Sequence, residues 1–163
     1  MQCVGPNTLS KRVSNSNREE CPPAVSGAFE ALTSPSLCPA IYMKHHLLFI
    51  CSGNLNRSPT AESLFSDSKY YESKPAGTDE HAVVRVSQDL IDWADIVFVM
   101  SEKDDGHLAF IANNFSLKNK PVCDLDVSDD YDRDDPELIS LLRRKIKRVI
   151  LQKGYPADAR SLG

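Results

Sequence analysis

Hydrophobic runs and amphipathic stretches alternate along the chain from His46 to about Gly154. Short continuous apolar runs are typical of buried strands, and hydrophobic positions that recur every three or four residues are typical of helices. Proline, glycine and acidic residues mark where these helices begin and end. The pattern predicts strands over 46–52, 74–78, 95–101 and 120–127, and helices over 59–70, 86–94, 102–115 and 136–153.

Strands that alternate with helices along a chain usually form one parallel sheet covered by helices on both faces. We therefore expect an α/β fold with a four-stranded parallel sheet, whose strands follow the order 2-1-3-4 when numbered along the chain. Ligands of such sheets bind beyond the carboxyl ends of the strands. Residues that follow the first and last strands can therefore meet in one cleft.

Residues 1–42 differ from the rest of the chain. They are rich in serine, proline and asparagine and show no sustained periodicity, which predicts a disordered N-terminal extension. We expect the folded domain over residues 43–155 and a C-terminal tail over 156–163. The chain has 163 residues and is 41% hydrophobic, which suits one domain with a proper core.

Charge and cysteine content narrow the class of protein. The net charge of −4 argues against general nucleic-acid binding, and no apolar run is long enough to span a membrane. The five cysteines show no close pairing and the sequence shows no signal peptide, which suits a reducing cytoplasm. His81 and His107 are isolated and are expected at the surface, and Cys123 is expected to be buried on its strand.

The stretch that follows the first strand carries the chemistry. It reads Cys51-Ser-Gly-Asn-Leu-Asn-Arg57, followed by Ser58-Pro59 at the start of a helix. A cysteine and an arginine at this spacing are weak evidence alone, because short motifs recur by chance. The strand before them, the glycine and asparagine between them and the helix start behind them make a phosphate-binding loop the favoured interpretation.

Each residue type in this loop suits a phosphate dianion held against a thiolate. A helix N-terminus and a guanidinium favour the thiolate form of a cysteine. Ser58 is expected as the N-cap and Pro59 as the first helical residue. Gly53 and Asn54 tolerate a positive φ, so that successive N–H groups can converge on an anion. Arg57 offers a planar fork for two phosphoryl oxygens, and the serine hydroxyl can donate to the sulfur.

A run of carboxylates follows the last predicted strand. Asp132, Asp134 and Asp135 are expected to be solvated or to cap the following helix. Asp129 is the favoured general acid, with Asp126 as the alternative, since such a group could protonate a leaving oxygen and then activate water. A calcium loop is disfavoured because the stretch lacks the glycine and the final glutamate that such loops use.

The sequence from Cys51 to Glu62 resembles the nucleophile loop of the low-molecular-weight protein tyrosine phosphatases, which reads Cys-x-Gly-Asn-x-Cys-Arg-Ser-Pro-x-Ala-Glu. The resemblance extends over about residues 44–154. The segments 76–78, 92–100 and 126–131 are similar to the end of the family's second strand, its third strand and its Asp-Pro-Tyr acid loop.

Three departures accompany this resemblance. Asn56 replaces the family's second loop cysteine, so a disulfide within the loop is not available. Asp130 replaces the proline of the acid loop. The segment 78–86 is short, and it lacks an identifiable aromatic wall for the substrate cleft. The chain therefore resembles a compact branch of the family.

The resemblance implies a cysteine-dependent phosphatase that needs no metal and no cofactor. Cys51 would attack phosphorus, Arg57 and the loop amides would hold the equatorial oxygens, and Asp129 would protonate the leaving group. The phosphate-binding residues expected are Ser52, Gly53, Asn54, Leu55, Asn56, Ser58 and Tyr131. The implied substrate is phosphotyrosine on a protein, while phosphoarginine and small phosphate esters stay open.

Two other classes of function can use such a loop. An arsenate reductase passes a disulfide to further cysteines, but only Cys123 follows Cys51, and access to that thiol is expected to be poor. A non-catalytic phosphate-binding module would need neither a nucleophile nor an acid, yet this chain carries candidates for both. The phosphatase is therefore the leading hypothesis.

Overall fold

The computed structural model describes residues 3–4 and 43–163. Apart from residues 3–4, the predicted N-terminal extension lies outside the described residues. The elements are β1 (Cys3–Val4), β2 (His45–Cys51), α1 (Arg57–Ser63), β3 (Tyr71–Gly77), α2 (Gln88–Trp93), β4 (Ile96–Val99), α3 (His107–Asn114), β5 (Val122–Asp124), α4 (Pro136–Gln152) and α5 (Ala159–Leu162).

These strands form one sheet in the order β1-β5-β4-β2-β3. The strands β2, β3, β4 and β5 are parallel, and β1 adds an antiparallel edge beside β5. The four parallel strands therefore confirm the predicted order 2-1-3-4. The edge strand β1 was not predicted, because two residues carry no periodicity.

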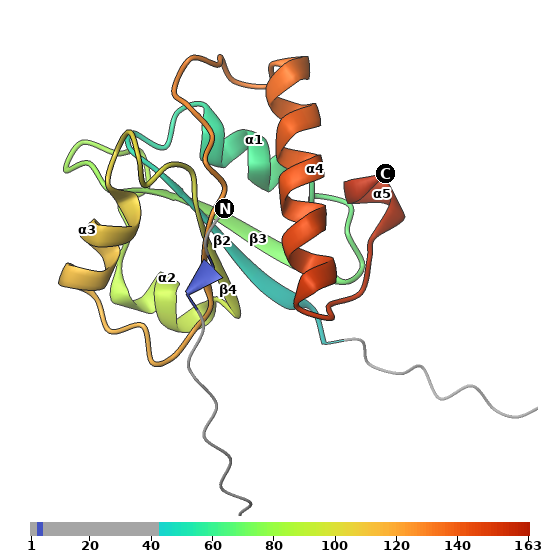
Figure 1. Ribbon diagram of the computed structural model, residues 1–163, viewed down its shortest axis with the longest axis horizontal. Helices are drawn as coiled ribbons and strands as arrows, with labels where there is room; N and C mark the ends of the chain where they lie inside the picture. Colours follow the sequence, from blue (N-terminus) through green and yellow to red (C-terminus); the bar gives the residue numbers. More distant parts are fainter. Residues whose placement is uncertain (1–2, 5–42) are drawn as a thin grey trace, which may run out of the picture. The chain divides into compact units, whose positions relative to one another are not determined.

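Helices cover both faces of the sheet (Figure 1). Successive side chains of a strand point to opposite faces, and β2 follows this rule. Leu47 and Phe49 join the cluster that includes residues of α1 and α4. Leu48 and Ile50 join the cluster that includes residues of α2 and α3. All four side chains are fully buried, so β2 packs against both layers of helices.

The strand register aligns the carboxyl ends of the parallel strands at one edge of the sheet. Cys51 at the end of β2 lies opposite Gly77 at the end of β3, and Val99 of β4 lies opposite Asp124 of β5. A side chain at Gly77 would meet the backbone oxygen of Ser52 at 2.4 Å. Glycine is therefore needed at this position, because the loop after β2 packs directly against it.

The first helix differs from its prediction. It spans Arg57–Ser63 instead of 59–70, and its N-cap is Asn56, so the prediction of Ser58 as N-cap is wrong. The loop already turns into helical geometry at Arg57, and the Ser58 hydroxyl bonds within the loop instead of capping the helix. Beyond Ser63 the chain makes turns and enters β3 at Tyr71, before the predicted residue 74.

Specific residues determine where the later helices begin. Gly106 adopts a φ of 63°, and α3 begins after it at His107 instead of at residue 102. The long helix α4 agrees with its prediction, since Asp135 accepts a hydrogen bond from the Glu137 N–H and proline follows as the first helical residue. The predicted C-terminal tail contains α5, which is capped by Asp158.

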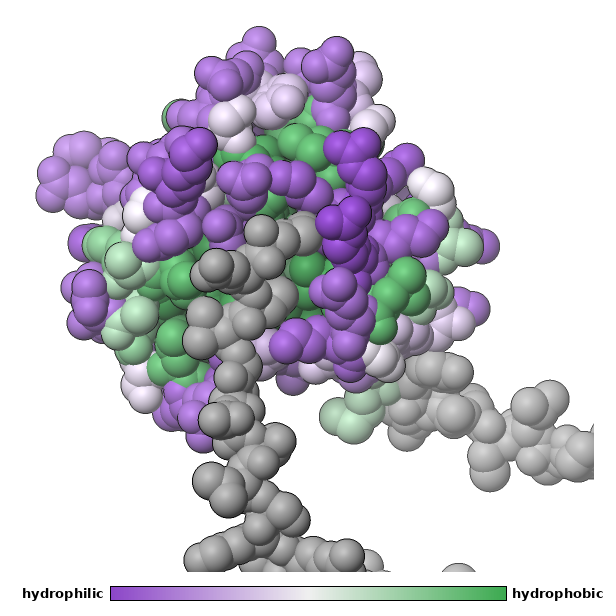
Figure 2. Space-filling model, viewed as in Figure 1, coloured by the Kyte–Doolittle hydropathy of each residue, from purple (hydrophilic) through white to green (hydrophobic). Residues whose placement is uncertain are grey.

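No helix within residues 3–4 and 43–163 is long and apolar enough to cross a membrane. The face of the molecule in Figure 2 carries many hydrophilic residues, with hydrophobic ones between them.

Candidate active site

The loop from Cys51 to Arg57 lies at the carboxyl end of β2, and its carbonyl groups are turned outward. The oxygens of Cys51, Ser52 and Gly53 accept hydrogen bonds from the backbone of the segment 78–83, at 2.9, 3.1 and 3.3 Å. The backbone N–H groups of residues 53–56 find no acceptor in the described part of the chain. Converging N–H groups without a protein acceptor are the kind of donors that suit an anion.

Asn54 and Gly53 differ in their backbone conformation. Asn54 has a φ of 55°, the left-handed conformation expected for the loop, and is 4% exposed. Gly53 tolerates a positive φ but does not adopt one. A side chain there would meet only Leu55, at an ordinary 3.5 Å, and nothing in the structure requires glycine at position 53.

The sulfur of Cys51 is buried beside the Ser58 hydroxyl. The residue is 3% exposed, and its Sγ lies 3.0 Å from Ser58 Oγ. That hydroxyl also lies 3.0 Å from Asn54 Oδ1 and 3.2 Å from the oxygen of Ala76. A serine hydroxyl has a single hydrogen, so it can donate to only one of these at a time. Rotation toward sulfur lets the same hydroxyl stabilise a thiolate.

Arg57 is the most enclosed charge of the site, at 1% exposure. Its Nη1 donates to Asp105 Oδ2 at 2.9 Å and to the oxygen of Val127 at 3.0 Å. Its Nη2 lies 2.8 Å from Asp129 Oδ1 and 3.4 Å from Ser52 Oγ. Among the described residues the buried Nε has no partner. The guanidinium is therefore fixed by two loops and keeps one donor unused.

His107 and Asp105 contact the loop through Ser52 and Arg57. Sequence reasoning missed both as site residues. His107 is 1% exposed, so its expected surface position is wrong. Its Nδ1 lies 3.3 Å from the Ser101 N–H and must accept, which leaves the proton on Nε2, 3.1 Å from Ser52 Oγ. Burial, assisted by the Arg57 charge, lowers the pKa of His107 although Asp105 opposes this. The neutral ring is the form that suits this bond.

The two candidate acids, Asp129 and Asp126, lie in different surroundings. Asp129, with a side chain 68% exposed, pairs with Arg57 inside the site. Asp126 lies 3.7 Å from Lys145 of α4, and its side chain is 58% exposed. The geometry therefore brings Asp129 and not Asp126 to the loop.

The rim of the site is formed by residues on either side of the loop. Leu55 is 61% exposed at the loop tip. The Asn56 amide donates to the backbone oxygen of Tyr131 at 3.2 Å, so that the backbone of Tyr131 lies beside the loop. Tyr131 is half-buried.

The chain is similar in structure to known phosphatases. No family model and no curated protein matches the chain. The tyrosine phosphatase Wzb from Escherichia coli K30 is 21% identical and matches with a TM-score of 0.53, over 68% of this chain and 99% of its own. The chain has the fold of the low-molecular-weight protein tyrosine phosphatases.

Two other solved structures are also similar to the chain. Vibrio vulnificus Wzb in complex with benzylphosphonate is 17% identical, with a TM-score of 0.50 over 68% of this chain and 97% of its own. The YwlE arginine phosphatase from Geobacillus stearothermophilus is 26% identical, with a TM-score of 0.48 over 70% of this chain and 99% of its own.

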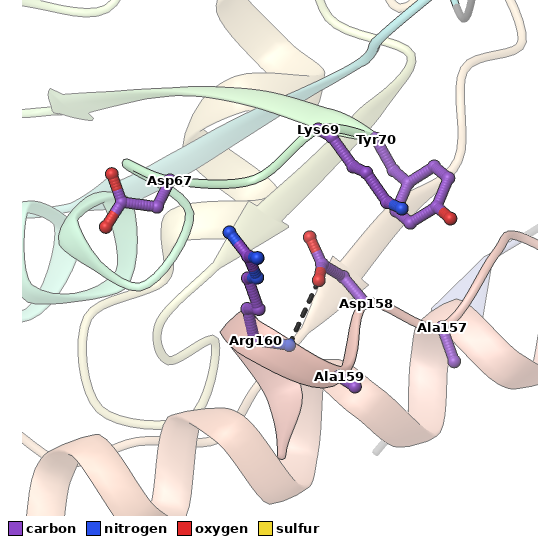
Figure 3. A pocket seen from close by; sticks show the side chains of 7 residues that line it. All are labelled: Asp67, Lys69, Tyr70, Ala157, Asp158, Ala159 and Arg160. Atoms are coloured by element: carbon purple, nitrogen blue, oxygen red, sulfur yellow. Dashed lines mark hydrogen bonds between the residues drawn. The ribbon is translucent and has the colours of Figure 1, made fainter.

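A separate pocket of about 290 Å³ lies at the other end of β3, where the C-terminal segment meets the turn before that strand. Figure 3 shows the Asp158 carboxylate in this pocket, bonded to the Arg160 N–H of its own helix turn. Asp158 also accepts hydrogen bonds from Ser68 and Ser161, and these donors lower its pKa although burial alone would raise it. The pocket contains none of the predicted site residues, and its contacts anchor the C-terminal segment.

Proposed function

We propose that this protein is a metal-independent phosphatase that hydrolyses phosphomonoesters through a cysteinyl-phosphate intermediate. The observation that carries the proposal is the loop around Cys51. A buried thiol lies in a loop whose N–H groups at 53–56 have no acceptor among the described residues, and the loop ends at a buried guanidinium. Such a site supplies fixed donors for the charge that develops on the equatorial oxygens during phosphoryl transfer.

Substrate binding replaces one anion by another at Arg57. The phosphate group takes the place of the Asp129 carboxylate at Nη2, now 2.8 Å away, and the loop N–H groups and the unused Nε complete its coordination. The bond from Nη1 to Asp105 is kept, so that the guanidinium does not turn.

Two displacement steps follow. The Cys51 thiolate attacks phosphorus in line, the bond to the leaving oxygen breaks, and Asp129 supplies the proton that this oxygen takes. Asp129 then accepts a proton from a water molecule that attacks the cysteinyl-phosphate, and the S–P bond breaks with its electrons on sulfur. The Ser58 hydroxyl, 3.0 Å from Sγ, stabilises the thiolate before the first step and after the second.

The substrate class that we propose is phosphotyrosine on a protein. Leu55 is apolar and 61% exposed at the tip of the loop, and Tyr131 follows the acid on the facing loop. The Leu55 side chain offers an aromatic leaving group apolar contact beside the phosphate position, whereas the Tyr131 side chain packs against the core and beside α4. The name of the Escherichia coli neighbour, a tyrosine phosphatase, agrees with this choice.

The test compares one peptide in its phosphotyrosine and phosphoarginine forms, with EDTA present. The expected result is release of phosphate from the phosphotyrosine form by the wild type and none by the Cys51→Ala variant. Faster release from phosphoarginine would overturn the substrate assignment but leave the mechanism. Equal binding without release of phosphate from either form would favour a non-catalytic phosphate-binding module.

A further inference from the structure

We propose that Asn56 and Thr60 are positioning residues that hold the acid loop, residues 126–135, against the start of α1. This inference rests on the proposed function, since it concerns how Asp129 is kept over the phosphate site. The two residues do not touch the reacting atoms through their side chains. They act through the backbone of the loop that carries the acid.

The acid loop does little to fix its own conformation, since its backbone forms one hydrogen bond within residues 126–135, from the N–H of Asp135 to the oxygen of Asp132 at 3.3 Å. Asp130 stands where a proline would restrict the backbone. Asp126 and Asp134, at the two ends of the loop, have φ values of 50° and 60°, a conformation that costs energy for residues other than glycine. Such strained positions persist only where neighbouring structure holds them, so the loop needs contacts from outside itself.

Two side chains at the start of α1 supply these contacts after the acid. The Asn56 Nδ2 donates to the oxygen of Tyr131 at 3.2 Å. The Thr60 hydroxyl donates to the oxygen of Asn56 at 2.8 Å and accepts from the N–H of Asp134 at 2.9 Å. The two bonds are thus linked through Asn56, and Thr60 is fully buried.

Arg57 supplies the matching contact before the acid, with Nη1 donating to the oxygen of Val127 at 3.0 Å. The N–H of Val127 also donates to the oxygen of Met100 at 2.6 Å, so Asp129 lies between a residue held on both sides, 127, and two anchors at residues 131 and 134. Its own carboxylate is 68% exposed, so its position depends on the backbone on either side. Losing the anchors after it lets the acid leave the reacting oxygen while the nucleophile loop stays intact.

The residue type at position 56 determines how well its side chain can donate to the backbone oxygen of Tyr131. A cysteine at that position, which the phosphatase pattern carries, has only a weak S–H donor. Asparagine donates an N–H hydrogen bond to a backbone oxygen. Asparagine at 56 and aspartate at 130 are therefore linked departures: the amide restores the restraint that a proline would have provided.

The test uses two aryl phosphates that differ in their need for an acid. Phenyl phosphate has a leaving group with a pKa near that of tyrosine, about 10, and requires a proton, whereas a dinitrophenyl phosphate requires little help. We expect Thr60→Val and Asn56→Ala to lower kcat/KM for phenyl phosphate about 10-fold more than for the dinitrophenyl ester, because a general acid contributes roughly 10²- to 10⁴-fold and these variants lose part of it.

Two controls separate positioning from support of the fold. Thr60→Ser keeps the hydroxyl and should keep the wild-type ratio between the two substrates. In the Asp129→Asn background, Thr60→Val should no longer change the ratio, because the group that it positions is gone. An equal loss on both substrates in Thr60→Val, with no restoration by serine, would show that Thr60 only supports the fold and would overturn the proposal.

A second measurement does not depend on turnover. Hydrogen exchange of the backbone N–H groups over 127–134 should be faster in Thr60→Val than in Thr60→Ser, while exchange in β2 and β4 stays the same. Equal exchange in the two variants would overturn the proposal. If the wild type released no phosphate at all, the proposed function would fail, and this exchange comparison would still decide whether Asn56 and Thr60 hold the loop.

Discussion

The pairing of Asp129 with Arg57 predicts that one substitution will weaken catalysis and strengthen phosphate binding. Arg57 faces two carboxylates, those of Asp105 and Asp129, both within 3 Å of its nitrogens. Phosphate must displace Asp129 before it can reach Nη2. Asp129→Asn removes the competing charge and, at the same time, removes the proposed general acid.

The magnitude follows from the exposure of the pair. The Asp129 side chain is 68% exposed, so the ion pair is screened by solvent and is worth about 0.2–1 kcal/mol. Its loss should tighten binding of inorganic phosphate by roughly 1.4- to 5-fold, and removing the repulsion between two anions acts in the same direction. Turnover should fall by about 10²- to 10⁴-fold, which is the usual contribution of a general acid.

The assay is calorimetric titration of the wild type and the variants with inorganic phosphate, together with kcat for an aryl phosphate. Asp130→Asn is the matched control, because it removes the same charge from the next residue, which forms no ion pair with Arg57. The control should bind phosphate with the wild-type affinity and keep the wild-type kcat. Phosphate that binds Asp129→Asn more weakly than Asp130→Asn would refute the argument that Asp129 occupies the anion's place.

Three further predictions concern single residues. Arg57→Lys keeps the charge but loses the fork that binds Asp105 and the phosphate, and steady-state kinetics should show kcat/KM lowered by about 10²- to 10³-fold. His107 has a folded-state pKa below its ordinary 6.5, so the unfolded chain binds more protons. Stability should therefore fall as pH drops through this value, and urea midpoints of His107→Gln should lose that pH dependence. Ser68→Ala removes a donor from the buried Asp158 and should lower the free energy of unfolding by about 1–3 kcal/mol, measured in urea, with kcat unaltered.

The order of strands could be predicted because it rests on regular alternation. A buried strand such as β2 places apolar side chains on both faces of the sheet, so it appears in the sequence as a continuous apolar run. Such runs alternate with the helices along the chain. The motif from Cys51 to Arg57 was equally readable, because its chemistry is local in sequence. Asp129 was found because it follows the last parallel strand, whose end lies at the same edge as that of the first.

Contacts between distant segments could not be predicted in the same way. Asp105 and His107 follow β4, so they too lie beyond the carboxyl end of a parallel strand. The sequence at this point also fits a helix that begins at residue 102, and this helix was the prediction. Only the turn at Gly106, with its φ of 63°, separates them and directs His107 inward toward Ser52, 55 positions earlier. Hydrogen bonds of this span leave no periodic trace in a sequence.

The first residue of α1 is a second feature that the sequence did not predict correctly. A serine before a proline is the usual sign of an N-cap, yet Ser58 is already helical and its hydroxyl contacts Cys51, Asn54 and Ala76. The proline pattern reports that a helix begins, but the tight loop decides which residue is first. The N-cap geometry therefore follows from packing against β3, which the local sequence does not contain.

The covalent intermediate is the central claim and can be tested directly. Asp129→Asn should slow hydrolysis of the intermediate, so that acid quenching during turnover of an aryl phosphate and peptide mass spectrometry find a phosphate group on Cys51. The same treatment of the double variant Cys51→Ser, Asp129→Asn should find none and no turnover. Phosphate release that continues in the double variant, or an Asp129→Asn enzyme that turns over without any phosphate on Cys51, would contradict the account.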